Sequence, residues 1–145
     1  MIRNMTINDY EEVYNLWLSC KGMGLNNLDD SKDGINKLLK RNPNTCFVYE
    51  IDKKIVGVIL GSHDGRRAHI NHLAVLEEYR NNKVATKLLD KTMEAFKKEG
   101  INKVNLVTFK TNDVGNSFWE KKGFKVREDL YYRDYIINQM IRNDT

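Results

Sequence analysis

The sequence has few of the residues that stabilise small extracellular domains or mark membrane proteins. It contains only two cysteines, Cys20 and Cys46, and one proline among 145 residues. Two cysteines are too few for a disulfide framework, so we expect reduced thiols and a cytoplasmic protein. No apolar run approaches the roughly 20 residues of a membrane-spanning helix, and the first residues lack the apolar stretch of a secretory signal. We therefore expect no membrane partner.

A large excess of charge of one sign is also missing. The 24 lysines and arginines against 20 aspartates and glutamates give a net charge of +4. A basic protein attracts polyanions, so a small nucleic-acid-binding protein is one alternative. Such a protein would interleave basic residues with exposed aromatic ones, whereas lysines here alternate with acids, as in residues 97–99 and 120–122. We therefore expect no nucleic-acid partner.

The spacing of apolar residues predicts one α/β domain over residues 1–145. Helical spacing and capping residues, including a capping box formed by Asn8 and Glu11, predict four helices, at 10–20, 31–41, 84–99 and 112–122. Strands are predicted at 2–6, 46–51, 55–60, 67–75 and 104–109, with a final strand region at 126–141. Consecutive hairpin strands followed by a βαβ crossover imply a mixed sheet with helices packed on it.

The junction between the strand at 69–75 and the long helix is the first place where chemistry is expected. A helix N-terminus presents free N–H groups and the positive end of the helix dipole. Arg80 and Lys83 add positive charge there, and the small side chains of Ala85 and Thr86 allow close approach. These features are typical of a pyrophosphate site, although an ordinary helix start with a solvated basic loop explains them equally well.

The helix that follows Asn112 is the second such place. Asn112, Gly115, Asn116 and Trp119 are spaced so that they share one helix face. This face combines two amides, a position without a side chain and a large ring, so a ligand can come close to it. Taken alone, the pattern is better explained by tight helix packing at Gly115 and a core position for Trp119.

Together the two segments resemble the GNAT superfamily of acyl-CoA-dependent N-acetyltransferases. The resemblance is strongest in LAVLEEYRNNKVA at 73–85 and NDVGNSFWEKKGF at 112–124, and the order of elements extends it to the whole chain. It implies a twisted mixed sheet whose two central parallel strands splay apart, flanked by about four helices. It also implies acetyl-CoA as cosubstrate and transfer of the acetyl group, by direct attack, to a primary amine of a small molecule or protein.

The resemblance assigns roles to three groups of residues. Strand backbone would contact the pantetheine arm, the loop and helix start would hold the pyrophosphate, and one face of the later helix would flank the thiol end. In that order, the groups are Leu73, Ala74 and Val75; Arg80, Asn81, Asn82, Lys83, Val84, Ala85 and Thr86; and Asn112, Gly115, Asn116 and Trp119.

Two positions depart from the family pattern. Lys83 replaces the first glycine of the family's loop, and a non-glycine residue is strained by roughly 1–2 kcal/mol if that position needs a positive φ. Trp119 stands where the family often has a tyrosine that protonates the departing thiolate, and an indole cannot act as that acid. We expect a substitute among Tyr131, Tyr132 and Tyr135, or water.

A general base is also needed, because an alkyl amine with a pKa near 10.4 is mostly protonated at neutral pH. The family often places a carboxylate on the strand before the loop, whereas this strand offers His69 and His72. We prefer His72 as the base; the alternative is a half-exposed strand histidine without a catalytic role. On a regular strand His69 and His72 face opposite sides, so no metal site is expected.

The acceptor amine and the oligomeric state stay open. Acids at 29–30, 33 and 128–129 could attract a cationic amine, or could simply be solvated. The tyrosine-rich stretch 131–135 could form a homodimer contact or line the acceptor site. Since the usual tyrosine and carboxylate are missing, an acyl-CoA-binding sensor without turnover is an alternative to the enzyme.

Overall fold

A five-stranded mixed sheet forms the centre of the computed structural model, which describes residues 1–144. The strands follow one another across the sheet in chain order, and β1 to β4 pair antiparallel whereas β5 runs parallel to β4. Their bounds are β1 (Ile2–Asn4), β2 (Cys46–Ile51), β3 (Lys54–His63), β4 (Ala68–Val75) and β5 (Val104–Asn105). The mixed α/β architecture predicted from the sequence is confirmed.

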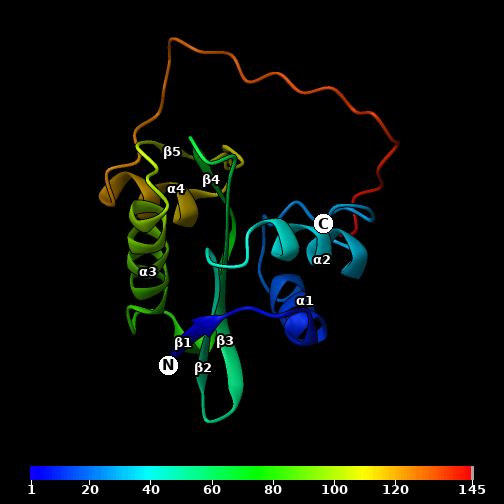
Figure 1. The fold of residues 1–145 in the computed structure, drawn as a ribbon, viewed down its shortest axis with the longest axis vertical. Helices are drawn as coiled ribbons and strands as arrows, with labels where there is room; N and C mark the ends of the chain where they lie inside the picture. Colours follow the sequence, from blue (N-terminus) through cyan, green and yellow to red (C-terminus); the bar gives the residue numbers. More distant parts are fainter. Residues whose placement is uncertain (145) are drawn as a thin grey trace.

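Helices cover both faces of this sheet (Figure 1). Helices α1 (Tyr10–Leu18) and α2 (Lys32–Arg41) pack on one face, and α3 (Val84–Lys98) with α4 (Asp113–Lys121) lies on the other side. Each face has its own apolar cluster, with Trp17 and Val13 of α1 in one and Leu88 and Phe96 of α3 in the other. Within residues 1–144, no helix is both long enough and apolar enough to cross a bilayer.

The helix starts follow local capping chemistry. The Ser31 hydroxyl accepts the N–H of Gly34 at 3.0 Å, so it caps α2 as its sequence predicts. The predicted capping box of Asn8 and Glu11 is wrong. A 3₁₀ turn (Ile7–Asp9) precedes α1 instead, and the carboxylate of Asp9 accepts the N–H of Thr6 at 2.9 Å. The reciprocal contact therefore forms between Thr6 and Asp9, two residues earlier than predicted.

The predicted final strand region, 126–141, is not formed. Residues after α4 run as an extended, exposed segment that arches across to the loop between α1 and α2 (Figure 1). Its end is attached there, since Arg142 forms an isolated bridge with Asn26 and the Asp144 carboxylate accepts the N–H groups of Gly24 and Leu25. A segment of high strand propensity forms a strand only where a neighbouring strand supplies hydrogen bonds. The neighbouring strand β5 is only two residues long, whereas the sequence predicts a six-residue strand at 104–109.

Candidate active site

A β-bulge interrupts β4 at His72. The register between β3 and β4 shifts between Val58 and Leu60, so His72 and Leu73 together lie opposite Ile59. His72 has a φ of +50°, in the left-handed region. This conformation costs a non-glycine residue about 1–2 kcal/mol, and strain of this kind is concentrated at functional sites. The bulge therefore marks this strand position as a candidate site.

The bulge also breaks the alternation of side chains along β4. Ile70 and Val75 both belong to the apolar cluster beneath α3, although they are five residues apart, whereas Ala74 belongs to the cluster beneath α1. The regular strand assumed in predicting opposite faces for His69 and His72 is therefore wrong. Residues 1–144 contain no group of three or more His, Cys, Asp or Glu side chains placed to hold a metal ion.

His72 contacts two side chains from the α1–α2 half of the molecule. Its Nε2 lies 2.7 Å from Oδ1 of Asp30, and the two side chains are only 14% and 7% exposed. The ring of Trp17 packs edge-on against the imidazole, with centroids 5.0 Å apart. The other oxygen of Asp30, Oδ2, accepts the backbone N–H of Asn26 at 2.9 Å. His72 is therefore held between a buried carboxylate and a buried indole.

Tyr10 fixes the loop that carries Asp30. Its hydroxyl donates a hydrogen bond of 2.6 Å to the backbone carbonyl of Asp30. Burial, followed by the proximity of Tyr14, Asp30 and Glu11, raises the pKa of Tyr10. The phenol thus keeps its proton and remains a donor, which ties the loop to α1.

The start of α3 presents free backbone donors. The first hydrogen bond of the helix joins the N–H of Lys87 to the carbonyl of Lys83, and among residues 1–144 no acceptor contacts the N–H groups of residues 84–86. Lys83 has a φ of +63° and Asn81 one of +69°. The positive φ that would strain a non-glycine residue at position 83 is therefore present. Free N–H groups at a helix N-terminus are suited to binding phosphate.

Arg80 is exposed, and its side chain folds back toward the end of β4. Its Nε donates to the carbonyl of Val75 at 3.2 Å, and one of its terminal nitrogens lies 3.6 Å from the sulfur of Cys20. The guanidinium therefore links the C-terminal ends of β4 and α1 beside the loop.

Strands β4 and β5 separate after a short contact. They pair only at Ala68 with Val104 and at His69 with Asn105, whereas β4 continues to Val75. Within residues 1–144, Ala74 and Val75 pair with β3 on one side, and no strand lies on the other side of the stretch from Leu73 to Val75. This splayed geometry leaves a strand edge without a partner strand next to the bulge, where the Val75 carbonyl accepts contacts from Arg80 and Cys20.

The predicted face of α4 is occupied by contacts within the protein. The Asn112 side chain caps the helix by accepting the N–H of Gly115 at 3.0 Å, and a Cβ at Gly115 would lie only 2.6 Å from the Asn112 amide nitrogen. Asn116 accepts a hydrogen bond from the Thr108 hydroxyl and donates to the Phe109 carbonyl at 3.0 Å. These two asparagines therefore shape the chain between β5 and α4.

Trp119, the last residue of that face, lies in the apolar core. Its side chain is 9% exposed and packs edge-on against Phe118 and Phe124, with both centroid distances 5.0 Å. It belongs to the cluster on the α3 face of the sheet. The indole is therefore buried among apolar groups.

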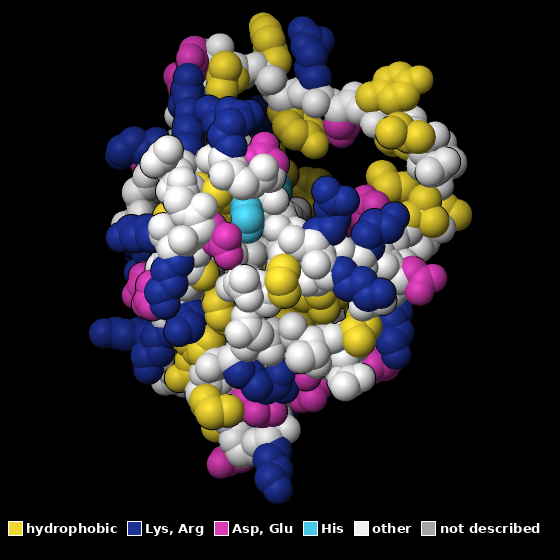
Figure 2. Space-filling view, in the orientation of Figure 1, with side chains coloured by type: hydrophobic (Ala, Val, Ile, Leu, Met, Phe, Trp, Pro, Cys, Tyr) yellow, Lys and Arg dark blue, Asp and Glu magenta, His cyan; other side chains and the backbone are white. Residues whose placement is uncertain are grey.

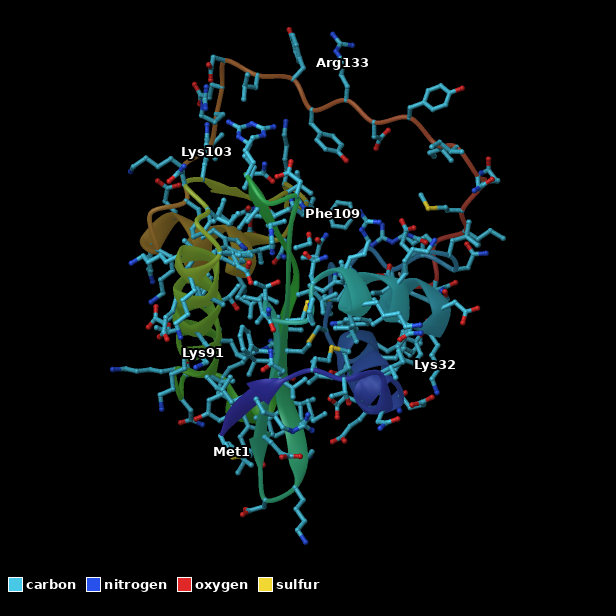
Figure 3. The ribbon with its side chains drawn as sticks, in the orientation of Figure 1. Met1, Lys32, Lys91, Lys103, Phe109 and Arg133 are labelled. Atoms are coloured by element: carbon cyan, nitrogen blue, oxygen red, sulfur yellow. The ribbon has the colours of Figure 1, made fainter. Side chains whose placement is uncertain are left out.

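Tyr131 and Tyr132 lie on the exposed segment after α4, with 89% and 73% of their surface accessible. Arg133, the next residue, extends from the arch into solvent (Figure 3). Neither tyrosine hydroxyl makes a hydrogen bond to any residue in 1–144, and the contacts of His72 are with Asp30 and Trp17.

Comparison with known proteins identifies the family. The model of the acetyltransferase (GNAT) family matches residues 10–124. The chain belongs to this family. An acetyltransferase of Sodalis glossinidius is 30% identical over 129 residues, which cover 89% of both chains. This protein is an acetyl-CoA-dependent N-acetyltransferase.

Solved structures agree with this acetyltransferase fold. Ard1 from Thermoplasma volcanium aligns with a TM-score of 0.78 and 26% identity over 88% of this chain and 83% of its own. The PaiA N-acetyltransferase from Thermoplasma acidophilum, solved in complex with coenzyme A, aligns with a TM-score of 0.76 and 25% identity over 88% and 91%. The mixed sheet with four helices predicted by the resemblance is thus confirmed, and the two parallel strands separate as predicted, although β5 lies at the edge of the sheet and not at its centre.

The residues of the acetyltransferase site fit its cosubstrate. Three free N–H groups at the start of α3 and the adjacent Lys83 suit a pyrophosphate, and the unpaired edge of β4 suits an amide-containing pantetheine arm.

Sequence reasoning missed Trp17 and counted Asp30 only among loop acids. Asp30 lies in a run of turn-forming residues, so its burial against a residue 42 positions away has no local signal.

Proposed function

We propose that this acetyltransferase modifies a primary amine of a small molecule or protein by direct attack, with His72 as general base. The observation that carries the proposal is the position of His72 on the β4 bulge, beside the strand edge that β5 leaves unpaired. Its ring is held by Asp30 and Trp17, so its orientation is defined before substrate binds. An imidazole is suited to accept a proton near neutral pH.

The cosubstrate is proposed to lie along β4 and over the start of α3. The backbone of Leu73, Ala74 and Val75 would bind the pantetheine arm, and residues 80–86 would bind the pyrophosphate through N–H groups and Lys83. On the α4 face, Asn112 and Asn116 would act at the thiol end indirectly. Their hydrogen bonds would hold in place the chain between β5 and α4. Gly115 supports that role by making room for the Asn112 side chain, and Trp119 would be a wall of the site.

The chemistry then requires only a few tasks of the protein. When bound, acetyl-CoA supplies an acetyl group on a thioester, which a neutral amine can attack directly. His72 removes the proton from the amine, because an alkyl amine is mostly protonated at neutral pH. The leaving group is a thiolate whose conjugate thiol has a pKa near 8.5, so water can protonate it. Tyr131 and Tyr132 act in this step only if the segment that carries them closes over the site.

Substitution of His72 by Gln tests the base. We expect the His72→Gln variant to lose about 100-fold or more in kcat, since general bases contribute roughly 10²–10⁴-fold, with its affinity for acetyl-CoA unchanged. The matched control is His69→Gln on the same strand, whose imidazole contacts Asn105 instead of Asp30. An unchanged rate in His72→Gln would refute the assignment.

The acceptor is proposed to be cationic, because exposed acids lie next to Asp30 in the loop and helix start between α1 and α2. Asp29 and Asp33 are exposed, whereas Asp129 is paired with Arg127 at 2.8 Å, and this contact lowers the pKa of Asp129 to about 2. Free thiol release with spermidine, kanamycin, lysine and a peptide with a free N-terminus would identify the class. Replacing Asp29 and Asp33 by asparagine should raise KM for the accepted amine without changing kcat.

A homodimer, the absence of a nucleic-acid partner and a cytoplasmic location are also proposals. The exposed segment carries apolar side chains including Tyr131, Tyr135 and Ile137, which is a surface suited to a second copy of the chain (Figure 2). Between residues 126 and 137 it has two arginines and three acids, which disfavours polyanion binding. Both cysteines are free thiols, in keeping with the cytoplasm. Light scattering after size-exclusion chromatography, with Tyr135→Ser and Ile137→Ser as variants, tests the dimer.

A further inference from the structure

We propose that Asp30 is a positioning residue that fixes the tautomer of His72 and thereby directs its Nδ1 toward the acceptor amine. This inference rests on the proposed role of His72 as general base. It concerns one hydrogen bond, between Nε2 of His72 and Oδ1 of Asp30 at 2.7 Å.

The two oxygens of Asp30 have different partners. Oδ2 accepts the backbone N–H of Asn26 at 2.9 Å, and this donor cannot be reversed. Oδ1 faces Nε2 of His72, and an ionised carboxylate can only accept hydrogen bonds. Nε2 must therefore carry the proton in neutral His72, which leaves the lone pair on Nδ1.

Nδ1 is the ring nitrogen that remains available. Among residues 1–144, no group makes a hydrogen bond to it, and the one buried side-chain nitrogen or oxygen without a partner is Nε1 of Trp17. Since Nδ1 has no partner and is not among the fully buried atoms, it keeps access to solvent. The proton-accepting atom therefore lies on the accessible side of a ring that is otherwise 14% exposed.

The groups around the imidazole keep this arrangement from changing. The Trp17 ring packs edge-on against it, which limits rotation of the imidazole. The Tyr10 hydroxyl holds the backbone of Asp30, and the Asn26 side chain in turn accepts the N–H groups of Leu28 and Asp29. Asp30 thus belongs to a structured loop and cannot move away from His72 without breaking several hydrogen bonds.

Replacing Asp30 by Asn separates tautomer control from shape. The Asn26 N–H still requires an oxygen, so the new amide must turn its NH2 toward His72. Nε2 then has to accept, the proton moves to Nδ1, and the accessible nitrogen can no longer take a proton from the amine. We expect kcat of the Asp30→Asn variant to fall about 100-fold or more, with KM for acetyl-CoA within about twofold of wild type.

The matched control is Asp52→Asn, which removes the same charge by the same substitution. Asp52 is exposed in the turn between β2 and β3 and makes no hydrogen bond to His72. We expect its kcat to stay within about twofold. An equal loss in both variants would show that net charge matters, not the tautomer, and would overturn the inference.

The tautomer itself can be observed by ¹⁵N NMR of the neutral His72 imidazole, which needs no turnover. The inference predicts a protonated Nε2 and an unprotonated Nδ1 in the wild type, and the reverse in Asp30→Asn. A protonated Nδ1 in the wild type would overturn it, even if Asp30→Asn failed to fold. A full rate in His72→Gln would instead refute the proposed base, so the two failures are distinguishable.

Discussion

Two residues with left-handed backbone, His72 and Lys83, lie at the two ends of the candidate site, one on the β4 bulge and one at the start of α3. Neither is glycine, so each conformation costs about 1–2 kcal/mol that surrounding contacts must offset. At His72 these contacts are the hydrogen bond to Asp30 and the packing on Trp17. Lys83 directly precedes the free N–H groups of α3, where its charge can assist phosphate binding.

Replacing Lys83 by Gly and by Ala separates strain from charge. Both variants lose the ammonium, but only Lys83→Gly removes the strain of φ +63°. We expect Lys83→Gly to be more stable than Lys83→Ala by about 1 kcal/mol in urea unfolding, and Lys83→Ala to bind coenzyme A more weakly than wild type in calorimetry. Equal stability of the two variants would show that position 83 is not strained.

At the scale of elements, the site depends on how closely α3 packs on the sheet. Gly57 and Gly61 of β3 face this helix, and a Cβ at Gly57 would lie 2.8 Å from Val84 Cγ1 and 2.9 Å from Leu88 Cδ1. Since Val84 is the first residue of α3, the missing side chain at Gly57 places the helix start, with its free N–H groups, directly against the sheet.

Adding a methyl group at Gly57 should therefore move or strain the start of α3. We expect Gly57→Ala to reduce the free energy of unfolding by about 1–3 kcal/mol, as overpacking does in well-packed cores. In a double-mutant cycle, Val84→Ala makes room for the new methyl, so the pair should be less destabilised than the sum of the single variants. Simple additivity would contradict this close contact.

The start of α4 gives a second prediction at this scale. Asn112 caps the helix through its side-chain oxygen, so Asn112→Ala should lower stability by about 0.5–2 kcal/mol, measured as a decrease in Tm. Asn112→Asp keeps an acceptor at the cap and should retain most of the stability. A similar loss in both variants would mean that the cap hydrogen bond is not the source of the effect.

At the scale of the whole molecule, the C-terminal segment arches beyond the end of the sheet from α4 to the α1–α2 loop (Figure 1). Its anchor is Asp144, whose carboxylate accepts two backbone N–H groups, from Gly24 at 2.9 Å and Leu25 at 2.8 Å. Burial raises the pKa of Asp144, but hydrogen bonds from Arg142, Gly24 and Leu25 outweigh it, so the pKa lies below its usual value. The anchored carboxylate is therefore ionised at neutral pH.

Acid should release this anchor. A carboxyl group whose folded pKa is lowered contributes its full stabilisation above its unfolded pKa, near 4, and loses it as the pH falls through the lower folded value. We expect hydrogen-exchange protection factors at Gly24 and Leu25 to decrease over that range. Asp144→Asn should show reduced protection already at pH 7 and little further change, whereas Asp134→Asn, on the exposed part of the segment, should behave like wild type.

Most of the local structure can be predicted from the sequence. Ser31 and Asn112 cap their helices, apolar spacing predicts α3 almost to the residue, and the β2, β3 and β4 strands follow their apolar runs. These features depend on residues within one or two turns or along one strand. The two motifs at 73–85 and 112–124 likewise suffice for the family, since a contiguous loop and helix carry them.

The contacts that assemble the candidate site depend on residues far apart in the chain. Asp30 meets His72 across 42 positions, and the bulge that presents His72 appears only in the pairing of β4 with β3. The extended state of residues 126–141 likewise follows from a β5 that offers two paired residues, despite a strand-forming sequence. Local spacing determines how each segment folds, but the placing of one segment against another depends on packing and backbone pairing, which no short stretch of sequence contains.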